Sequence, residues 1–262
     1  MMIKLLIDQL DRKVGLSVYP PQRIVSLVPS QTELLADLGL EEQVVGLTKF
    51  CVHPSSWRKD KTIVGGTKQL HLDRIRQLKP DLIIANQEEN DREQVEMLAQ
   101  EFPVWVSKVV DVPTALEMIL GIGEATGTKG LAAQLAKKIN TCFTQLKKFP
   151  LRSCAYLIWR KPYMASGGDT FINAMLEIAG FKNVFAHKNR YPEISLEQLA
   201  AAEPEWILLS SEPFPFREKH LVELSSVCPN AEVRLVDGEL FSWYGSRLLR
   251  SADYFRTLRE AE

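Results

Sequence analysis

Short apolar runs alternate with helix-like segments along most of the chain. Residues 23–28, 81–85 and 104–110 are short runs rich in Val, Ile and Leu, of the length that buried strands have. Between them, apolar residues recur every three or four positions, for example over 72–78, which is the spacing of one helix face. Strands that alternate with helices predict the α/β class, with the strands parallel in each sheet.

The pattern occurs twice. LDRIRQLKPDLIIA (72–85) and LEQLAAAEPEWILLS (196–210) both read as a helix, a proline and a buried strand. The offset of 124 residues that relates Asp73 to Glu197 also relates the two prolines. An internal repeat of this kind predicts two lobes built on a similar plan.

A second pair of segments precedes these copies. RIVSLVPSQTELLADLGL (23–40) and AYLIWRKPYMASGGDTFINAMLEIAGF (155–181) each predict a strand, a loop, a helix and a terminating glycine. Helix starts are expected at side chains that bind free backbone N–H groups. The candidate caps are Ser30 with Glu33 in the first helix and Asp169 or Thr170 in the second.

The segment TKGLAAQLAKKINTCFTQLKKF (128–149) separates the two copies. After Gly130 it contains no proline or glycine, so it predicts one helix of about 20 residues, roughly 30 Å long. We expect two Rossmann-like lobes with parallel sheets, 1–127 and 150–262, joined by this long backbone helix. Ligands bind beyond the carboxyl ends of parallel strands, so a slot between the lobes is the expected binding site.

Composition narrows the functional classes. The chain has 262 residues, 45% hydrophobic and 25% charged, as in an ordinary globular protein. The net charge of −1 gives no basic footprint for nucleic acid. The amino-terminal apolar run is broken early by Asp8 and Asp11, unlike a secretory signal, so the chain reads as cytoplasmic. Four scattered cysteines without a C-x-x-C pair are expected to be reduced thiols.

The stretch TKFCVHPSSW (48–57) is the strongest candidate for chemistry. On an extended segment Cys51 and His53 would face the same way and could contact the metal of a bound complex. Two ligands alone make a poor zinc site, and a catalytic Cys–His pair needs a third, orienting group. Ordinary loop packing is the competing interpretation.

Loops after the predicted strands are rich in aromatic residues, which suits a large planar ligand. The glycine pairs in GGTK (65–68) and GGDT (167–170) lack the spacing of phosphate-binding loops. GIGEATG (121–127) does not follow a predicted strand, and we interpret it as a transition between helices. Nucleotide binding is therefore not predicted.

Four blocks together resemble the helical-backbone (class III) substrate-binding proteins of ABC importers for cobalamin, haem and iron–siderophore complexes. They are RIVSLVPSQTELLADLGL, KPDLIIA, PYMASGGDTFINAMLEIAGFKNVF and YPEISLEQLAAAEPEWILL. The resemblance is nearest to the cobalamin-binding members. It implies a monomeric binding protein, not an enzyme, that needs no cofactor and holds a cobalamin-like or metal-chelate ligand. The candidate contacts are Ser30, Phe50, Cys51, His53, Tyr163, Arg190, Tyr191, Trp243 and Arg247.

The resemblance also implies a partner. Acids on the two lobes of such proteins dock onto arginines of the membrane permease, and Asp73 and Glu197 occupy the corresponding positions. Both are equally explained as acids favoured at helix amino termini. The family is exported to the periplasm or cell envelope, whereas this chain shows no leader. The alternative is therefore a cytosolic enzyme or sensor for a corrinoid or tetrapyrrole, using Cys51, His53 or the Glu88–Glu89 pair.

Overall fold

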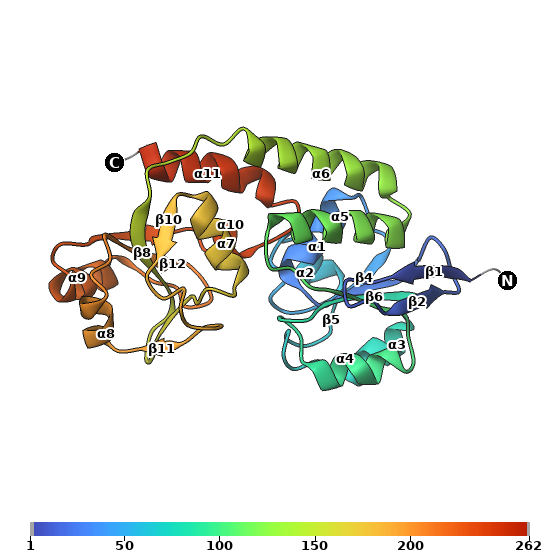
Figure 1. Ribbon diagram of the computed structural model, residues 1–262. Coiled ribbons are helices and arrows are strands. Elements are labelled where there is room, and N and C mark those ends of the chain that lie inside the picture. Colours follow the sequence, from blue (N-terminus) through green and yellow to red (C-terminus); the bar gives the residue numbers. More distant parts are fainter. Residues whose placement is uncertain (1–2, 261–262) are drawn as a thin grey trace. The chain divides into compact units, whose positions relative to one another are not determined.

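The computed structural model describes residues 3–260, which form two compact units (Figure 1). Of these residues, the first unit comprises 3–109, 113–141 and 244–248. The second comprises 110–112, 142–243 and 249–260. The predicted boundaries 1–127, 128–149 and 150–262 stay predictions. Packing contacts assign residues 244–248 to the first unit, whereas the sequence-based boundaries put them in the second.

The first unit is built on a parallel sheet with strand order β5-β4-β3-β6-β7. Its strands are β3 (Ile24–Ser26), β4 (Val44–Leu47), β5 (Thr62–Ile63), β6 (Leu82–Asn86) and β7 (Val104–Ser107). Every residue of β3, β6 and β7 is buried, which is why these strands read as continuous apolar runs.

Helices cover both faces of this sheet. Figure 1 shows α3 and α4 on one side and α1, α5 and α6 on the other. Their bounds are α1 (Pro29–Asp37), α2 (Trp57–Asp60), α3 (Leu72–Leu78), α4 (Arg92–Ala99), α5 (Val112–Thr126) and α6 (Lys129–Thr144). The predicted transition at 121–127 is present, because α5 ends just before Gly127 and α6 starts at Lys129.

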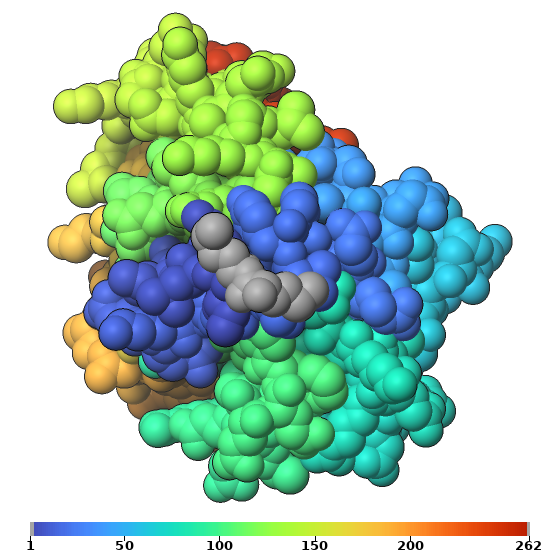
Figure 2. Space-filling model, turned by 90° about the vertical axis from the view of Figure 1, so that its right-hand side faces the viewer, coloured from blue at the N-terminus to red at the C-terminus, as the bar shows by residue number. Residues whose placement is uncertain are grey.

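An amino-terminal hairpin, β1 (Lys4–Ile7) and β2 (Lys13–Leu16), lies beside β7 and was not predicted. Figure 2 shows it in dark blue on the surface of this unit. Asp8, at its turn, accepts hydrogen bonds from the backbone of Val106 and from the Arg12 guanidinium. Gln9 donates to the Val106 carbonyl in return. These bonds satisfy polar groups on the outer edge of β7, so Asp8, one of the two acids that break the apolar run, joins the hairpin to the sheet.

The second unit carries a mixed sheet, order β11-β9-β8-β12-β13, with β10 also paired to β8. Its strands are β8 (Arg152–Trp159), β9 (Tyr163–Ala165), β10 (Phe181–Asn183), β11 (Glu193–Ile194), β12 (Trp206–Ser210) and β13 (Glu232–Val236). The pairs β8–β10, β8–β12 and β12–β13 are parallel, as predicted. The pairs β8–β9 and β9–β11 are antiparallel, so the predicted parallel sheet has an antiparallel edge in this unit. A short connection after β8 turns the chain straight back, which only an antiparallel pair allows.

Helices of the second unit are α7 (Phe171–Ile178), α8 (Leu196–Ala201), α9 (Glu218–Val227), α10 (Glu239–Ser242) and α11 (Leu248–Glu260). Thr170 caps α7 by accepting from the Asn173 backbone N–H, so the second of its two candidate caps is the right one. The core contains an apolar cluster in which Leu157, Ile207 and Leu209 are fully buried. Near the carboxyl terminus, buried Arg259 donates to the carbonyls of Pro150 and Gly180.

The repeat is visible in the structure residue by residue. Lys79 and Glu203, 124 positions apart, both have left-handed φ angles, of 46° and 44°. Two residues later, Asp81 accepts from the backbone N–H of Arg23, and Glu205 accepts from that of Ser153. In each unit, therefore, an acid after the proline binds the start of the neighbouring strand.

The predicted linking helix is present but shorter than expected. α6 has 16 residues and ends at Thr144, so residues 145–149 are not helical. Pro150 disfavours helical backbone at Phe149, and the Phe149 ring lies 5.7 Å from the Arg259 guanidinium. Among residues 3–260, no helix is both long and apolar enough to cross a membrane.

Candidate functional site

Cys51 lies in the interior of the first unit. Its exposed fraction is 0%, and its thiol is hydrogen bonded with the hydroxyls of Thr32 (3.0 Å) and Thr48 (3.2 Å). Burial raises the pKa of the thiol, which keeps it protonated. The chain turns just before this residue, where Cys51 donates its N–H to the Thr48 carbonyl. That Cys51 and His53 face the same way stays a prediction. Cys51 is thus placed for packing.

His53 and Phe50 lie nearer the surface, on the loop that follows β4. His53 is half-buried. Phe50 is 50% exposed, and the Lys49 ammonium lies 5.0 Å from its ring centroid. Gly66 comes against the edge of this ring, since a Cβ there would stand 3.2 Å from it. Of the predicted contacts in the first unit, Phe50 presents the largest apolar surface for a ligand.

Ser30 and Arg247 serve the packing of helix α1. The predicted capping box at Ser30 and Glu33 is wrong, because α1 begins at Pro29 and Ser30 is buried inside its first turn. The Arg247 guanidinium instead donates to both oxygens of Glu33, at 2.8 and 2.6 Å. Both side chains of this pair are largely buried. Arg247 already has an anionic partner, so we do not include it among the proposed contacts.

Tyr163 belongs to a polar cluster in the second unit. The Arg160 guanidinium binds both oxygens of Glu223 on α9, and the Tyr163 hydroxyl donates to the same carboxylate at 2.8 Å. Burial raises the pKa of Tyr163, and the hydrogen bond to Glu223 raises it further. The ring is half-buried, with its hydroxyl turned into this cluster.

Arg190 and Tyr191 lie together on the loop before β11. The Arg190 guanidinium carbon is 5.9 Å from the Tyr191 ring centroid, and the side chain is exposed. The backbone N–H of Arg190 donates to the Asp169 carboxylate, which fixes the loop against the glycine pair. Gly167 and Gly168 donate to the carbonyls of Arg190 and Lys188, so their amides are used within the unit.

Trp243 is held by the half-buried carboxylate of Glu212. Its indole N–H donates to Glu212 at 2.8 Å, and the Ser242 hydroxyl donates to the same oxygen at 2.6 Å. Burial raises the pKa of Glu212, while these two donors oppose the rise. Trp243 is only 7% exposed, so it presents little surface to a ligand.

The two predicted docking acids occupy matching places. Asp73 lies in the first turn of α3, 90% exposed at its side chain and 2.9 Å from Arg76. It borders a surface hollow of about 460 Å³ together with His71 and Arg74. Glu197 is exposed in the first turn of α8, where the Ser195 hydroxyl and the backbone lower its pKa.

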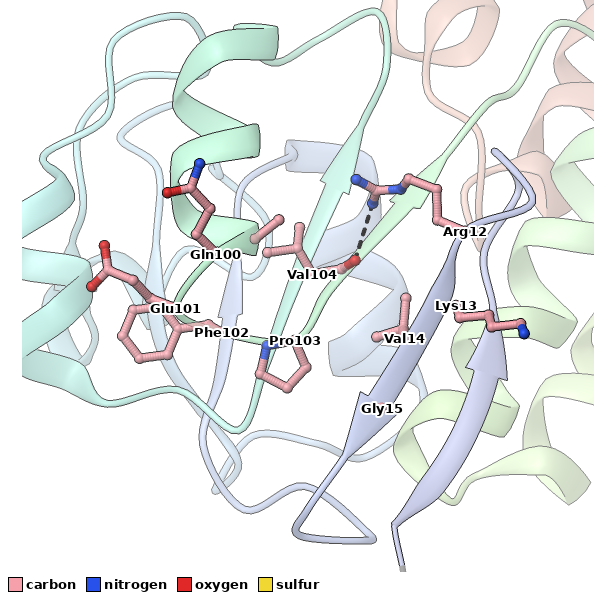
Figure 3. Close-up of a pocket in the computed structure, with 10 residues that line it drawn as sticks. Arg12, Lys13, Val14, Gly15, Gln100, Glu101, Phe102, Pro103 and Val104 are labelled. Atoms are coloured by element: carbon pink, nitrogen blue, oxygen red, sulfur yellow. Dashed lines mark hydrogen bonds between the residues drawn. The ribbon is translucent and has the colours of Figure 1, made fainter.

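Metal coordination by the chain alone finds no support. Within residues 3–260 no group of three or more His, Cys, Asp or Glu side chains is arranged to hold a metal ion. Figure 3 shows a second hollow, of about 360 Å³, lined by residues 12–15 of the hairpin turn and β2 and by residues 99–104. Arg12 crosses it to the Val104 carbonyl, and the predicted ligand contacts lie elsewhere in the chain.

One aromatic residue at a strand end, Trp159, was not predicted as a ligand contact from the sequence. Trp159, the last residue of β8, is 39% exposed, and Phe214 packs edge-on against it. The run YLIW reads as one buried strand, so its pattern alone does not show that the last side chain is exposed.

Comparison with known proteins shows which family the chain resembles. The periplasmic binding protein family matches residues 24–223. A vitamin B12-binding protein of Vibrio campbellii is 27% identical over 198 residues, 73% of this chain and 71% of that protein. An uncharacterized ABC transporter substrate-binding lipoprotein of Bacillus subtilis is 28% identical over 201 residues, 72% and 63% of the two chains. The crystal structure of a periplasmic vitamin B12-binding protein of Vibrio cholerae superimposes with a TM-score of 0.80 at 21% identity, covering 92% and 98%.

The family match, which spans most of the chain, shows that the protein belongs to the periplasmic binding protein family. It is a substrate-binding protein and not an enzyme, in agreement with the predicted α/β fold and function. The family binds small-molecule ligands and works with ABC transporters. The alternative of a cytosolic enzyme that uses Cys51 is not favoured, because that thiol is buried and protonated.

Proposed function

We propose that the chain binds a cobalamin-like compound or another metal chelate and delivers it to an ABC importer. The observation that carries the proposal is the similarity to vitamin B12-binding proteins over about three quarters of the chain. The exposed aromatic surface of Phe50, beside Lys49, supports it because a flat, partly polar ligand suits such a surface.

The bound compound is here called the cargo. Contacts from the first unit would come from Phe50 and His53, and contacts from the second from Tyr163, Arg190 and Tyr191. The Arg190 guanidinium, exposed beside Tyr191, would pair with a carboxylate or phosphate of the cargo. The half-buried His53 imidazole would contact the metal or a polar edge of the cargo. That the two halves hold one ligand jointly stays a prediction, as does the monomeric state.

Equilibrium dialysis against cyanocobalamin, haemin and ferric siderophores tests this proposal. We expect at least one of these compounds to bind with a Kd below ~100 μM (about −5.5 kcal/mol). Phe50→Ala should weaken binding, whereas Met97→Ala, which alters a similarly exposed apolar residue on α4, should not. Failure of all these compounds to bind would overturn the proposal.

We also propose that Asp73 and Glu197 dock the protein onto its permease. Each acid is exposed in the first turn of a helix at the same place of the repeat, so the two form matched anionic points. Such charges set orientation and encounter rate more than affinity. The variant Asp73→Lys, Glu197→Lys should reduce cargo uptake by cells at least tenfold while dialysis shows unchanged cargo binding.

A matched control reverses two other exposed first-turn acids, Glu93 on α4 and Glu218 on α9. This control variant should retain uptake, because its acids lie outside the repeated positions. Equal loss of uptake in both double variants would show a general charge effect and would contradict docking at Asp73 and Glu197.

A further inference from the structure

Trp159 differs from the other tryptophans in its exposure. The chain has five tryptophans, all within residues 3–260. Trp57, Trp105, Trp206 and Trp243 are at most 7% exposed, whereas Trp159 is 39% exposed. A large apolar side chain left in water at a strand end carries a cost that a ligand surface would remove.

An irregularity in β8 orients this side chain. Leu157 pairs with Ala165 and Trp159 with Met164, so two steps along β8 correspond to one along β9. This is a β-bulge, which bends a strand and redirects the side chain that follows it. Leu157 and Ile158 are buried, whereas Trp159, the first residue of β8 after this register shift, is exposed.

A layer of rings supports Trp159 from behind. Phe214 packs edge-on against it, with ring centroids 5.7 Å apart, and Phe216 packs on Phe214 at 4.8 Å. His220 closes the layer, 5.5 Å from Phe214, and is itself buried. The Phe214 N–H also donates to the Ile158 carbonyl, which joins this loop to the end of β8.

The adjoining residue is fixed as well. Arg160 is held by both oxygens of Glu223, so the backbone directly after Trp159 is tied to α9. The bulge, the ring layer and this ion pair hold the indole in one place while leaving part of it in solvent. Such preorganisation is typical of a binding surface, since it lowers the entropy lost on binding.

We propose that Trp159, supported by Phe214, is a cargo contact that selects ligands with a flat conjugated face. Its place at the carboxyl end of β8, next to the end of β12, is where α/β proteins bind ligands. The inference rests on the proposed function and adds to it a residue and a selection rule. A macrocycle or an aromatic chelate stacks on the indole, whereas an aliphatic chelate gains little from it.

Equilibrium dialysis of Trp159→Ala and Trp159→Phe with cyanocobalamin and haemin tests the contact. We expect Trp159→Ala to weaken binding roughly three- to tenfold and Trp159→Phe to restore most of it, because a ring stacks in both cases. The matched control is Leu235→Ala in the same unit, whose side chain is similarly exposed at 40%. Ferrichrome, an aliphatic chelate, should bind wild type and Trp159→Ala alike.

Acrylamide quenching gives a second, independent readout. Trp159 should supply most of the accessible emission of the free protein, and cyanocobalamin or haemin should protect that fraction from acrylamide. If wild type binds but Trp159→Ala binds equally well, or the indole stays accessible in the loaded protein, this inference alone is overturned. If wild type binds no compound, the proposed function falls and the inference with it.

Discussion

Replacing Arg247 with methionine tests whether its ion pair with Glu33 holds the 244–248 segment on α1. The two side chains are only 6% and 14% exposed, and two hydrogen bonds join them. Methionine fills similar volume but leaves the Glu33 carboxylate without its guanidinium. Removing one partner of a buried pair costs about 3–5 kcal/mol, far more than an exposed pair would.

That magnitude predicts a measurable loss of thermal stability. For a chain of this size, each kcal/mol shifts Tm by roughly 2–4 °C, so Arg247→Met should lower Tm by roughly 10 °C in calorimetry. The double variant Glu33→Leu, Arg247→Met should regain at least about half of this, because it leaves no unpaired charge. At temperatures where Arg247→Met is folded, it should bind cargo as wild type does.

Two results would refute this reasoning. A loss of Tm below about 2 °C would show that the pair contributes little. Unchanged stability together with lost cargo binding would show that Arg247 contacts the cargo, as the sequence alone suggested. The exposed Arg92–Glu96 pair on α4 is the control, and Arg92→Met should leave Tm nearly unchanged.

Three further predictions concern a buried histidine, two cysteines and two glycines. Burial lowers the pKa of His220 below the value near 6.5 that it has in the unfolded chain. The unfolded state therefore binds the proton more readily, so Tm should fall as the pH drops from 7.5 through 6.5 to 5. His220→Asn should flatten the dependence of Tm on pH, whereas His187→Asn, at an exposed site, should not. Equal slopes in wild type and both variants would contradict the role of His220. An aromatic disulfide reagent should modify the half-buried Cys142 first, and rapid labelling of Cys51 in the native protein would disprove its interior placement. Gly168→Ala should destabilise the protein by more than ~2 kcal/mol in urea unfolding, because the new Cβ would meet the Ala186 carbonyl oxygen. The control Gly130→Ala has open space around its Cβ and should be neutral or stabilising.

The sequence predicted what short-range patterns determine. Helix–proline–strand segments depend on local preferences, so both copies of the repeat appear at the expected offset of 124 residues. The structure adds a left-handed residue to each copy, at 79 and 203. The capped start of α7 at Thr170 is equally local. Such features need no knowledge of distant partners.

Features that depend on distant partners were missed. Asp8 reads as an interruption because its partner, the Val106 N–H, lies 98 residues away. Glu33 looked like a capping residue because Arg247, 214 residues away, cannot be paired with it from the sequence. The interior position of Cys51 depends on a turn, and the exposure of Trp159 on a bulge, that residue spacing does not reveal.

The docked hairpin has a practical consequence for anyone who shortens this protein. A truncation starting at Ile24, where the family match begins, would keep the whole parallel sheet yet uncover the outer edge of β7. An uncovered strand of that kind recruits strands from other molecules. Poor solubility of such a fragment would reflect the edge of β7 that the hairpin turn no longer covers, and not a weakly packed interior.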